Sequence, residues 1–332
     1  MRPLYLVVGI ALLVLVIVDI LWTTLWVDGG SGPVSGRLTT GVWQGLRAVS
    51  ADHDRALSLA GPLILTLTLA TWVALIWVGW TFVFASYPTA LVSTRTGAAA
   101  DWSGRFYYVA YTMFTNGNGD YAPIGDVWEI ASAFTTATGM AFVTLGVSYV
   151  LTVLGAVSDK RSFASSVTGV GDRSEAFVRT AWTGAEHRGT ALSLESLASE
   201  LGTLAEQHKS YPILHYYHSE QSDRASSVAV PILDEALTLY RHGVPDGHGP
   251  DPMLVEAARS SVQDYLETLD TAFIEPAEEV PPPPDLDRLR EEGIPTVDDE
   301  AFADALADLS ERRRRLLGVA KGDAWEWPPV EE

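Results

Sequence analysis

The chain has 332 residues, of which 47% are hydrophobic, contains no cysteine and carries a formal net charge of −20. Without cysteine it can form neither a disulfide-stapled secreted module nor a thiolate metal site. So acidic a chain also argues against nucleic acid as a partner, because nucleic-acid binding depends on basic side chains that neutralise phosphates. Residues 1–158 have 6 basic and 8 acidic side chains, whereas residues 159–332 have 16 and 34. The two halves are therefore expected to lie in different solvents.

The N-terminal segment, residues 1–27, is long and apolar, and Arg2 precedes its hydrophobic run as in a signal peptide. Hydrophobic regions of signal peptides span only ~7–15 residues. This run ends instead in an aromatic cluster with Trp22 and Trp26, which suits a membrane interface. We predict a retained transmembrane helix. Within it, Asp19 either lies close to the interface and reaches water or makes a hydrogen bond to a neighbouring helix.

Two further apolar segments predict membrane-spanning helices. The 39 residues between Arg55 and Arg95 and the 29 residues between Glu129 and Asp159 contain no charged side chain. About 20 apolar residues suffice to cross the hydrocarbon layer of a bilayer. We predict spanning helices over 60–85 and 128–157.

Residues 28–58 connect the first two spans. Val34, Leu38 and Val42 recur at helical spacing in this segment. The pattern favours a short amphipathic helix on the cytoplasmic membrane surface, and an ordinary helix packed on protein fits it equally.

Between the second and third predicted spans lies a segment too polar to cross. Residues 101–114 have the pattern of a short amphipathic helix, and residues 115–120, Thr-Asn-Gly-Asn-Gly-Asp, form a glycine-dependent run. Non-helical backbone at membrane depth is tolerated only where it is buried in protein or lines a watery path, and a re-entrant loop meets that condition. The alternative is a surface turn, because Asn-Gly is a strong turn signal.

Residues 59–158 resemble the pore module of prokaryotic potassium channels. The order of elements is the same: a spanning helix, a short re-entrant helix, the run Thr-x-Gly-x-Gly-Asp and another spanning helix. In that family, the carbonyl oxygens of the Thr-Val-Gly-Tyr-Gly filter replace the hydration shell of the ion. Successive carbonyls can face one axis only if the backbone alternates with left-handed conformations, which Gly117 and Gly119 adopt at little cost. The resemblance implies a homotetramer with K⁺ or Na⁺ as the permeant ion. The implied filter is Thr115, Asn116, Gly117, Asn118, Gly119 and Asp120.

The filter departs from the family pattern where Asn116 and Asn118 replace the family's Val and Tyr. Loss of the Tyr ring predicts weaker discrimination between K⁺ and Na⁺. The rival hypothesis is that the Asn amides form their own network with tyrosines of the preceding helix and hold the filter just as firmly.

Three further residues follow the filter. Gly139 is a candidate hinge of the inner helix, or a site where another helix packs closely. Asp126 and Glu129 are candidates for an acidic ring at the outer mouth, or are solvated charges that favour a helix start. No span carries arginine at every third position, so we expect no voltage-sensor helix.

The resemblance also implies a topology in the plasma membrane. A loop that dips in from outside puts the N-terminus outside and residues 28–58 and 159–332 in the cytoplasm. Basic residues are enriched in the segments that would then be inside, as the positive-inside rule expects. These are Arg37, Arg47, Arg55, Lys160, Arg161, Arg173 and Arg179 inside, against Arg2, Arg95 and Arg105 outside.

The second half is predicted to be a helical cytoplasmic domain over 159–274, with helical patterns near 172–208, 225–242 and 252–273. His215 and His218 could share a helix face and bind a metal or sense protons, or they could be ordinary packing residues. Residues 275–332 are acidic and contain four consecutive prolines, and this composition predicts a mostly disordered tail in which one helix survives.

Taken together, these patterns predict an all-α membrane protein with three transmembrane helices, a pore helix and filter, and a cytoplasmic domain whose ligand the sequence does not identify. The function that fits best is a cation channel without a cofactor. The alternative is a membrane-anchored interaction or sensor protein. No set of catalytic residues appears at workable spacing, so an enzyme is not expected.

Overall fold

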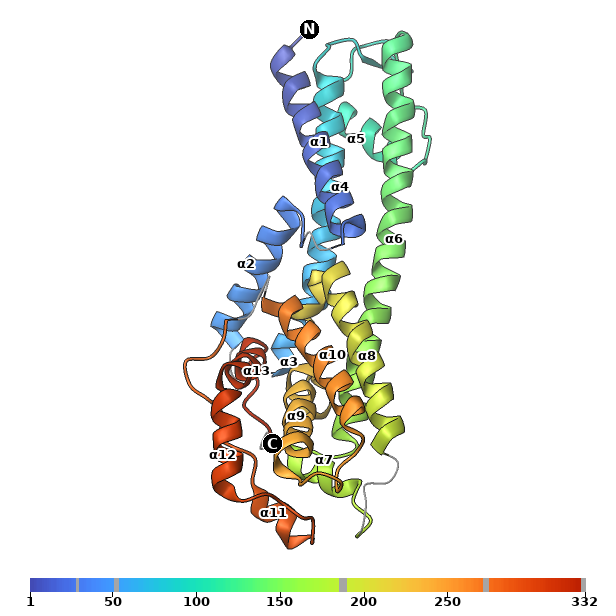
Figure 1. The fold of residues 1–332 in the computed structure, drawn as a ribbon. Coiled ribbons are helices and arrows are strands. Elements are labelled where there is room, and N and C mark those ends of the chain that lie inside the picture. The colour runs from blue at the N-terminus through green and yellow to red at the C-terminus, as the bar shows by residue number, and fades with distance from the viewer. Residues whose placement is uncertain (28–29, 51–53, 185–189, 271–274, 330–332) are drawn as a thin grey trace. The chain divides into compact units, whose positions relative to one another are not determined.

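The computed structural model describes residues 1–27, 30–50, 54–184, 190–270 and 275–329. It divides into two compact units: the first is Met1–Val42 with Pro62–Val153, and the second is Trp43–Gly61 with Leu154–Glu332. Figure 1 gives the order of the elements along the chain. The expected domain boundaries after residues 27 and 274, and parts of the expected helices 172–208 and 252–273, lie outside the described residues.

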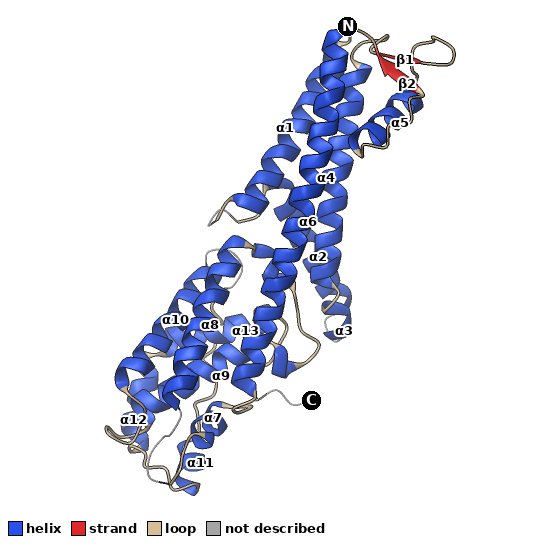
Figure 2. Ribbon diagram, turned by 90° about the vertical axis from the view of Figure 1, so that its right-hand side faces the viewer, coloured by secondary structure: helices blue, strands red, loops and turns tan. Residues whose placement is uncertain are grey.

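The first unit is built on long apolar helices: α1 (Pro3–Leu25), α4 (Ala60–Ala85) and the 43-residue α6 (Asp126–Thr168), which continues into the second unit. They run side by side in both views (Figures 1 and 2). Three helical segments, Pro3–Leu25, Arg55–Ala85 and Asp126–Thr168, are long and apolar enough to cross a membrane. The chain is therefore a mostly helical membrane protein, as expected.

Helix α4 is the centre of the first unit. Gly79 of α4 faces Gly9 and Leu13 of α1 so closely that a Cβ at Gly9 would lie 2.8 Å from the Gly79 carbonyl oxygen. On another side, the indole of Trp72 packs against Phe142 and Tyr149 of α6. Small residues on one side and aromatic rings on the other thus fix α1 and α6 against α4.

Asp19 of α1 is fully buried and binds two neighbouring helices. Its carboxylate accepts hydrogen bonds from the indole Nε1 of Trp72 at 2.7 Å and from the backbone N–H of Val34 at 2.7 Å. Ser35, one residue further along α2 (Pro33–Ser50), adds its own N–H and hydroxyl. Of the two interpretations of this carboxylate, the hydrogen bond to a neighbouring helix is the one found, and it stabilises the N-terminus of α2 as a helix cap does.

A two-stranded antiparallel sheet joins the segments on either side of α5 (Trp102–Met113), the short helix expected over 101–114. Strand β1 (Leu91–Ser93) pairs with β2 (Tyr121–Pro123), with Val92 opposite Ala122. The sequence analysis did not predict this sheet, because strands of three residues are too short to show a period. Figure 2 shows it beside α5.

The second unit packs around α9 (Ser226–Thr238), all of whose residues are buried. Helices α7 (Ser174–Thr180) and α10 (Pro252–Asp270) pack against it, and α8 (Thr190–Ser210) packs against α10. Short turns connect them: η1 (Pro212–Tyr216), η2 (Ser222–Arg224) and η3 (Leu239–Gly243). The second half of α2 and the short helix α3 (Asp54–Leu57) also belong to this unit.

The expectation of a mostly disordered tail over 275–332 is wrong. This region contains α11 (Leu286–Glu291), α12 (Asp299–Asp308) and α13 (Ser310–Gly322). Leu316 and Val319 of α13 enter the same core as α9. Two buried ion pairs, Arg312 to Asp234 at 2.6 Å and Arg313 to Glu235 at 2.7 Å, then fix α13 on α9. The average composition of the segment does not reveal these few apolar and ion-paired positions of α13, which fix the segment on the core.

Candidate functional site

The candidate site is the loop that follows α5. Asp101 caps the start of this helix by accepting a hydrogen bond from the Gly104 N–H at 2.7 Å. At the other end, the Asn116 N–H donates to the carbonyl oxygen of Tyr111 at 2.7 Å, so the chain leaves the helix along a fixed path. The helix therefore determines where residues 115–120 begin.

The backbone of this loop alternates between ordinary and left-handed conformations. The angle φ is +59° at Thr115, +61° at Gly117 and +74° at Gly119, whereas Asn116 and Asn118 are not among the residues with positive φ. A Cβ at Gly117 or Gly119 would meet no atom within 4 Å, so the backbone conformation rather than crowding requires glycine there. Thr115 holds a left-handed conformation that a β-branched residue rarely adopts.

The carbonyl groups of residues 115–118 are unused within the chain. In the described parts of the structure, no hydrogen bond is made to them, and residues 115–119 are all exposed. Backbone carbonyls must be paired within the protein only where they are buried, so exposed ones are free to bind water or another ligand. A run of exposed carbonyls on an alternating backbone is therefore suited to bind something outside the chain.

The far end of the loop is fixed by the strand segment. The hydroxyl of Thr94 donates to the Gly119 carbonyl oxygen at 2.8 Å, and the Thr94 N–H donates to the Asp120 carbonyl oxygen at 3.0 Å. Arg95 pairs with the Asp120 carboxylate at 2.7 Å. Hydrogen bonds from Arg95 and Tyr107 hold the pKa of the Asp120 carboxyl below its ordinary value. Sequence reasoning missed Thr94 and Arg95, because no local pattern links them to residues 25 positions away.

The side chains of the loop form a network with α5. Asn116 donates from Nδ2 to Oδ1 of Asn118 at 2.9 Å, and Asn118 in turn donates to the hydroxyl of Tyr107. The same hydroxyl donates to Oδ2 of Asp120 at 3.1 Å. This amide–tyrosine network has the form that the rival hypothesis requires.

Helix α6 exposes a stripe of small and hydroxyl side chains. Ala137, Ala141, Thr144, Ser148 and Thr152 recur at intervals of three or four residues and are all exposed. The hydroxyls of Thr144 and Thr152 donate to carbonyl oxygens one turn earlier, which leaves oxygen lone pairs directed away from the helix. This hydroxyl stripe was missed, although its helical period was visible in the sequence.

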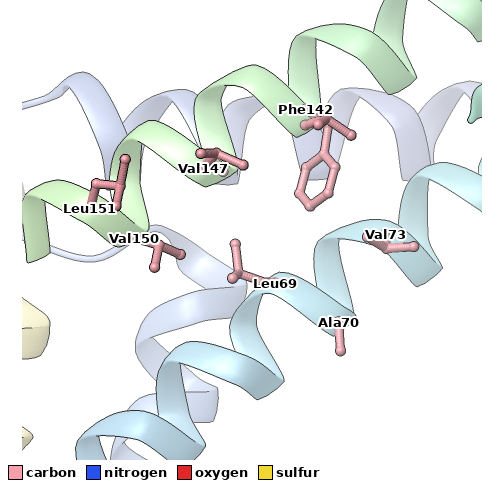
Figure 3. Close-up of a pocket in the computed structure, with 9 residues that line it drawn as sticks. Leu69, Ala70, Val73, Phe142, Val147, Val150 and Leu151 are labelled. Carbon is pink, nitrogen blue, oxygen red and sulfur yellow. The ribbon is translucent and has the colours of Figure 1, made fainter. Parts of the chain in front are cut away.

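Beside the hydroxyl stripe, α4 and α6 enclose an apolar groove of about 360 Å³ (Figure 3). Val147 and Leu151 on its rim are exposed at 56% and 65%, and Gly146 forms part of its wall. Its lining consists of Leu69, Ala70, Val73, Phe142, Val143, Gly146, Val147, Val150 and Leu151.

Gly139 lies against the end of α5. A Cβ there would overlap the carbonyl oxygen and the side chain of Met113, so close packing accounts for this glycine. Its role as a hinge stays a prediction. Asp126 and Glu129 both lie exposed in the first turn of α6, where carboxylates favour a helix start, and their contribution to an acidic outer mouth is likewise a prediction.

His215 and His218 do not share a helix face, because η1 ends at Tyr216 and His218 lies beyond it. Burial lowers the pKa of His215 to about 4, which keeps its ring neutral near pH 7. His218 is buried with Nδ1 3.1 Å from the Asp323 carboxylate. In the described parts of the chain, no group of three or more His, Cys, Asp or Glu residues could hold a metal ion.

Comparison with known proteins identifies a relative from Bacillus subtilis (strain 168), the uncharacterized membrane protein YdjJ, with 43% identity over 328 residues. The alignment covers 99% of this chain and 96% of that protein. No family model matches the sequence, and no solved structure is significantly similar.

Proposed function

The chain belongs to the same family as this Bacillus subtilis membrane protein, and on that premise we propose that it forms a homotetrameric channel for monovalent cations, with K⁺ as the principal ion. Residues 115–120 act as the filter. The conducting assembly lies in the plasma membrane, with the N-terminus outside and the C-terminal domain in the cytoplasm.

The observation that carries this proposal is the run of unused carbonyls on alternating backbone at residues 115–118. A cation that sheds water needs several oxygens at once, and rings of backbone carbonyls supply them in selective channels. One chain supplies one side of such a ring. Four copies around an axis surround the ion, and the exposed side of the loop then faces that axis.

The surface of α6 supports the same arrangement. The hydroxyl stripe provides a wall that can contact water and ions, and it lies on α6 next to the apolar groove. In a fourfold assembly, a helix that lines the axis contacts a neighbouring copy on its flank. The groove at that flank is apolar and large enough to accept side chains of the next copy.

The content of the two units supports the sidedness. The segment Trp43–Gly61 belongs to the same compact unit as Leu154–Glu332, which is what a connection between α1 and α4 on the domain side of the membrane requires. The loop 115–120 belongs to the other unit. The basic residues on the domain side favour the cytoplasm for that side.

The proposal is tested by K⁺ flux and a pair of cysteine variants in purified protein reconstituted into liposomes. Because the chain has no cysteine, single substitutions report without background. We expect a thiol reagent to block flux through Ser148→Cys, on the hydroxyl stripe, and to leave flux through Val147→Cys unchanged. Both positions are exposed in the single chain, but only Val147 lies in the groove assigned to the next copy, so the pair separates the pathway from the flank. Folded tetramers without flux under any tested voltage, pH or ligand would favour a membrane-anchored interaction protein instead.

A further inference from the structure

A charged side chain near the end of α6 is buried inside the second unit. Lys160 is only 4% exposed, and its Nζ donates to the carbonyl oxygens of Leu214 and Tyr217, both at 3.1 Å. These carbonyls belong to the last turn of η1 and the residue after it. Removing a buried ammonium from such partners is costly, so Lys160 fixes the rotation of α6 at this point.

The same short segment contacts the start of α4 and the second half of α2. The ring of Tyr217 covers Gly61 so closely that a Cβ there would lie 2.5 Å from the ring. The adjacent Tyr216 meets the indole of Trp43 edge-on, with ring centroids 5.7 Å apart. Residues 212–218, here called the junction segment, thus touch α2 in the connection between the first two spans and the first turn of α4.

On its other side, the junction segment binds the C-terminal end of the chain. The His218 ring stacks on the indole of Trp325, with centroids 5.1 Å apart, and its Nδ1 faces the Asp323 carboxylate. Asp323 is 4% exposed and also accepts a hydrogen bond from the Ser227 hydroxyl at 2.7 Å. A shift of residues 323–325 therefore moves His218, and with it the carbonyls that hold Lys160.

We propose that the junction segment is a coupling element that transmits the position of the C-terminal residues 323–325 to α4 and α6, with Lys160 as its positioning residue. The role of this coupling in opening the channel rests on the proposed function. Helix α6 is continuous from Asp126 to Thr168, so a rotation at Lys160 is carried about three turns back to Ser148 on the hydroxyl stripe. The C-terminal end then controls how wide the pathway is without touching the filter.

The test uses the full-length protein with two readouts, of which only one depends on conduction. A nitroxide on Ser158→Cys, an exposed position on α6, reports the mobility of the helix end, and liposome assays report flux and reversal potential. The variants are Lys160→Met and Trp325→Ala, alone and combined. Lys209→Met, whose lysine binds Glu206 at the domain surface, is the matched control.

We expect Lys160→Met and Trp325→Ala each to increase label mobility and to change flux by about fivefold or more, with the reversal potential unchanged. In the double variant, the second substitution adds no further change, because both break one connection. Lys209→Met behaves as wild type. If Lys160→Met does not fold, Asp323→Asn, which removes a charge and keeps the side-chain shape, takes its place in the cycle.

Unchanged label mobility in both single variants would overturn the coupling itself. Increased mobility with unchanged flux, or effects on flux that multiply independently, would show that the contacts only stabilise the domain and would overturn the regulatory role. Increased, non-additive mobility in a protein that conducts in no form would support the coupling of α6 to the C-terminal end and would overturn the proposed function.

Discussion

The loop of residues 115–120 and the junction segment differ in whether their polar groups have partners within the chain. Residues 115–118 leave their carbonyl groups exposed and without a hydrogen bond in the described structure, on a backbone that includes a left-handed threonine. In the second unit, Lys160 and Asp323 are charged and almost fully buried, and each has hydrogen-bond partners from elements distant in sequence. The first arrangement is open to ligands outside the chain, and in the second the buried charges have partners within the chain.

This difference has an energetic consequence. In the proposed channel, the unused backbone carbonyls and exposed apolar faces reach their final environment only when other copies, ions and lipid are present. Buried charges with partners within the chain cost several kcal/mol when one partner is removed. Substitutions in the loop should therefore affect function more than folding, and substitutions around α9 and α13 should affect folding first.

The sharpest test of the first half of this comparison is the pair Gly117→Ala and Gly119→Ala. Both glycines have left-handed backbone, where a Cβ costs ~1–2 kcal/mol per residue and turns the carbonyls away. We expect K⁺ flux to fall below detection while the tetramer, measured by size exclusion with light scattering, remains.

Gly97→Ala is the matched control, because Gly97 has φ of +69° and open space around its Cβ position, but lies outside residues 115–120. The Gly97→Ala variant should have similar local backbone strain and should conduct K⁺ like the wild type. Wild-type conduction in either filter variant would remove the filter assignment.

The expectation that substitutions around α9 and α13 affect folding first is tested at α13. Arg312→Met leaves Asp234, whose side chain is 1% exposed, without its ion-pair partner. We expect a loss of about 3–5 kcal/mol in the free energy of unfolding, which a melting curve of the detergent-solubilised protein detects. Combining it with Asp234→Asn should recover part of the loss.

Arg179→Met is the control, because Arg179 pairs with Glu292 at 3.3 Å and about half of each side chain is exposed. Such a surface pair contributes less than about 1 kcal/mol. Equal stability of Arg312→Met and wild type would restore the disordered-tail interpretation of residues 275–332.

A third test uses pH and acts only on the second unit. Burial lowers the pKa of His208 to about 3 and that of His215 to about 4, from an ordinary value of 6.5. The unfolded chain therefore binds more protons than the folded chain below pH 6.5, and stability is lost as the pH falls. At pH 4.5 each of the two histidine rings should lower the free energy of unfolding by about 2 kcal/mol relative to its value at pH 7.

Melting curves across this range, recorded for wild type and for His208→Gln, check this expectation. The variant should show a shallower decline with acid than the wild type. Parallel declines would mean that His208 has the same pKa in the folded and the unfolded chain.

The smallest expected effect returns to the loop. Tyr107→Phe removes the hydroxyl that joins Asn118 to Asp120 and should reduce discrimination of K⁺ over Na⁺ by about 3–10-fold, the equivalent of one hydrogen bond. Reversal potentials under bi-ionic conditions measure this change. Tyr87→Phe, on an exposed ring outside the network, should keep the wild-type value.

A wild-type channel that already admits Na⁺ as readily as K⁺ would contradict the hypothesis that the amide network holds the filter firmly. In that case the replacement of the family's Tyr by Asn118 weakens the filter, and Asn118→Tyr with Asn116→Val should restore part of the selectivity.

The sequence by itself determined the membrane-spanning segments, the short helix and the loop with glycine at alternate positions. Each depends on a local property: a length of apolar residues, a cap at Asp101, or a backbone conformation that only glycine adopts easily. Such properties act between residues a few positions apart, so they can be read directly along the chain.

Only the tertiary structure decided how Asn118 is held, whether residues 275–332 fold, and what surrounds Asp19 and His218. Tyr107 meets Asn118 across a helix end, Arg312 meets Asp234 over 78 positions, and His218 meets Asp323 over 105. The average composition of residues 275–332 contains no information on such partners. It therefore predicted disorder for an acidic segment that forms helices. A buried charge is stable only beside its partner, and which residues become partners is decided when distant segments pack together.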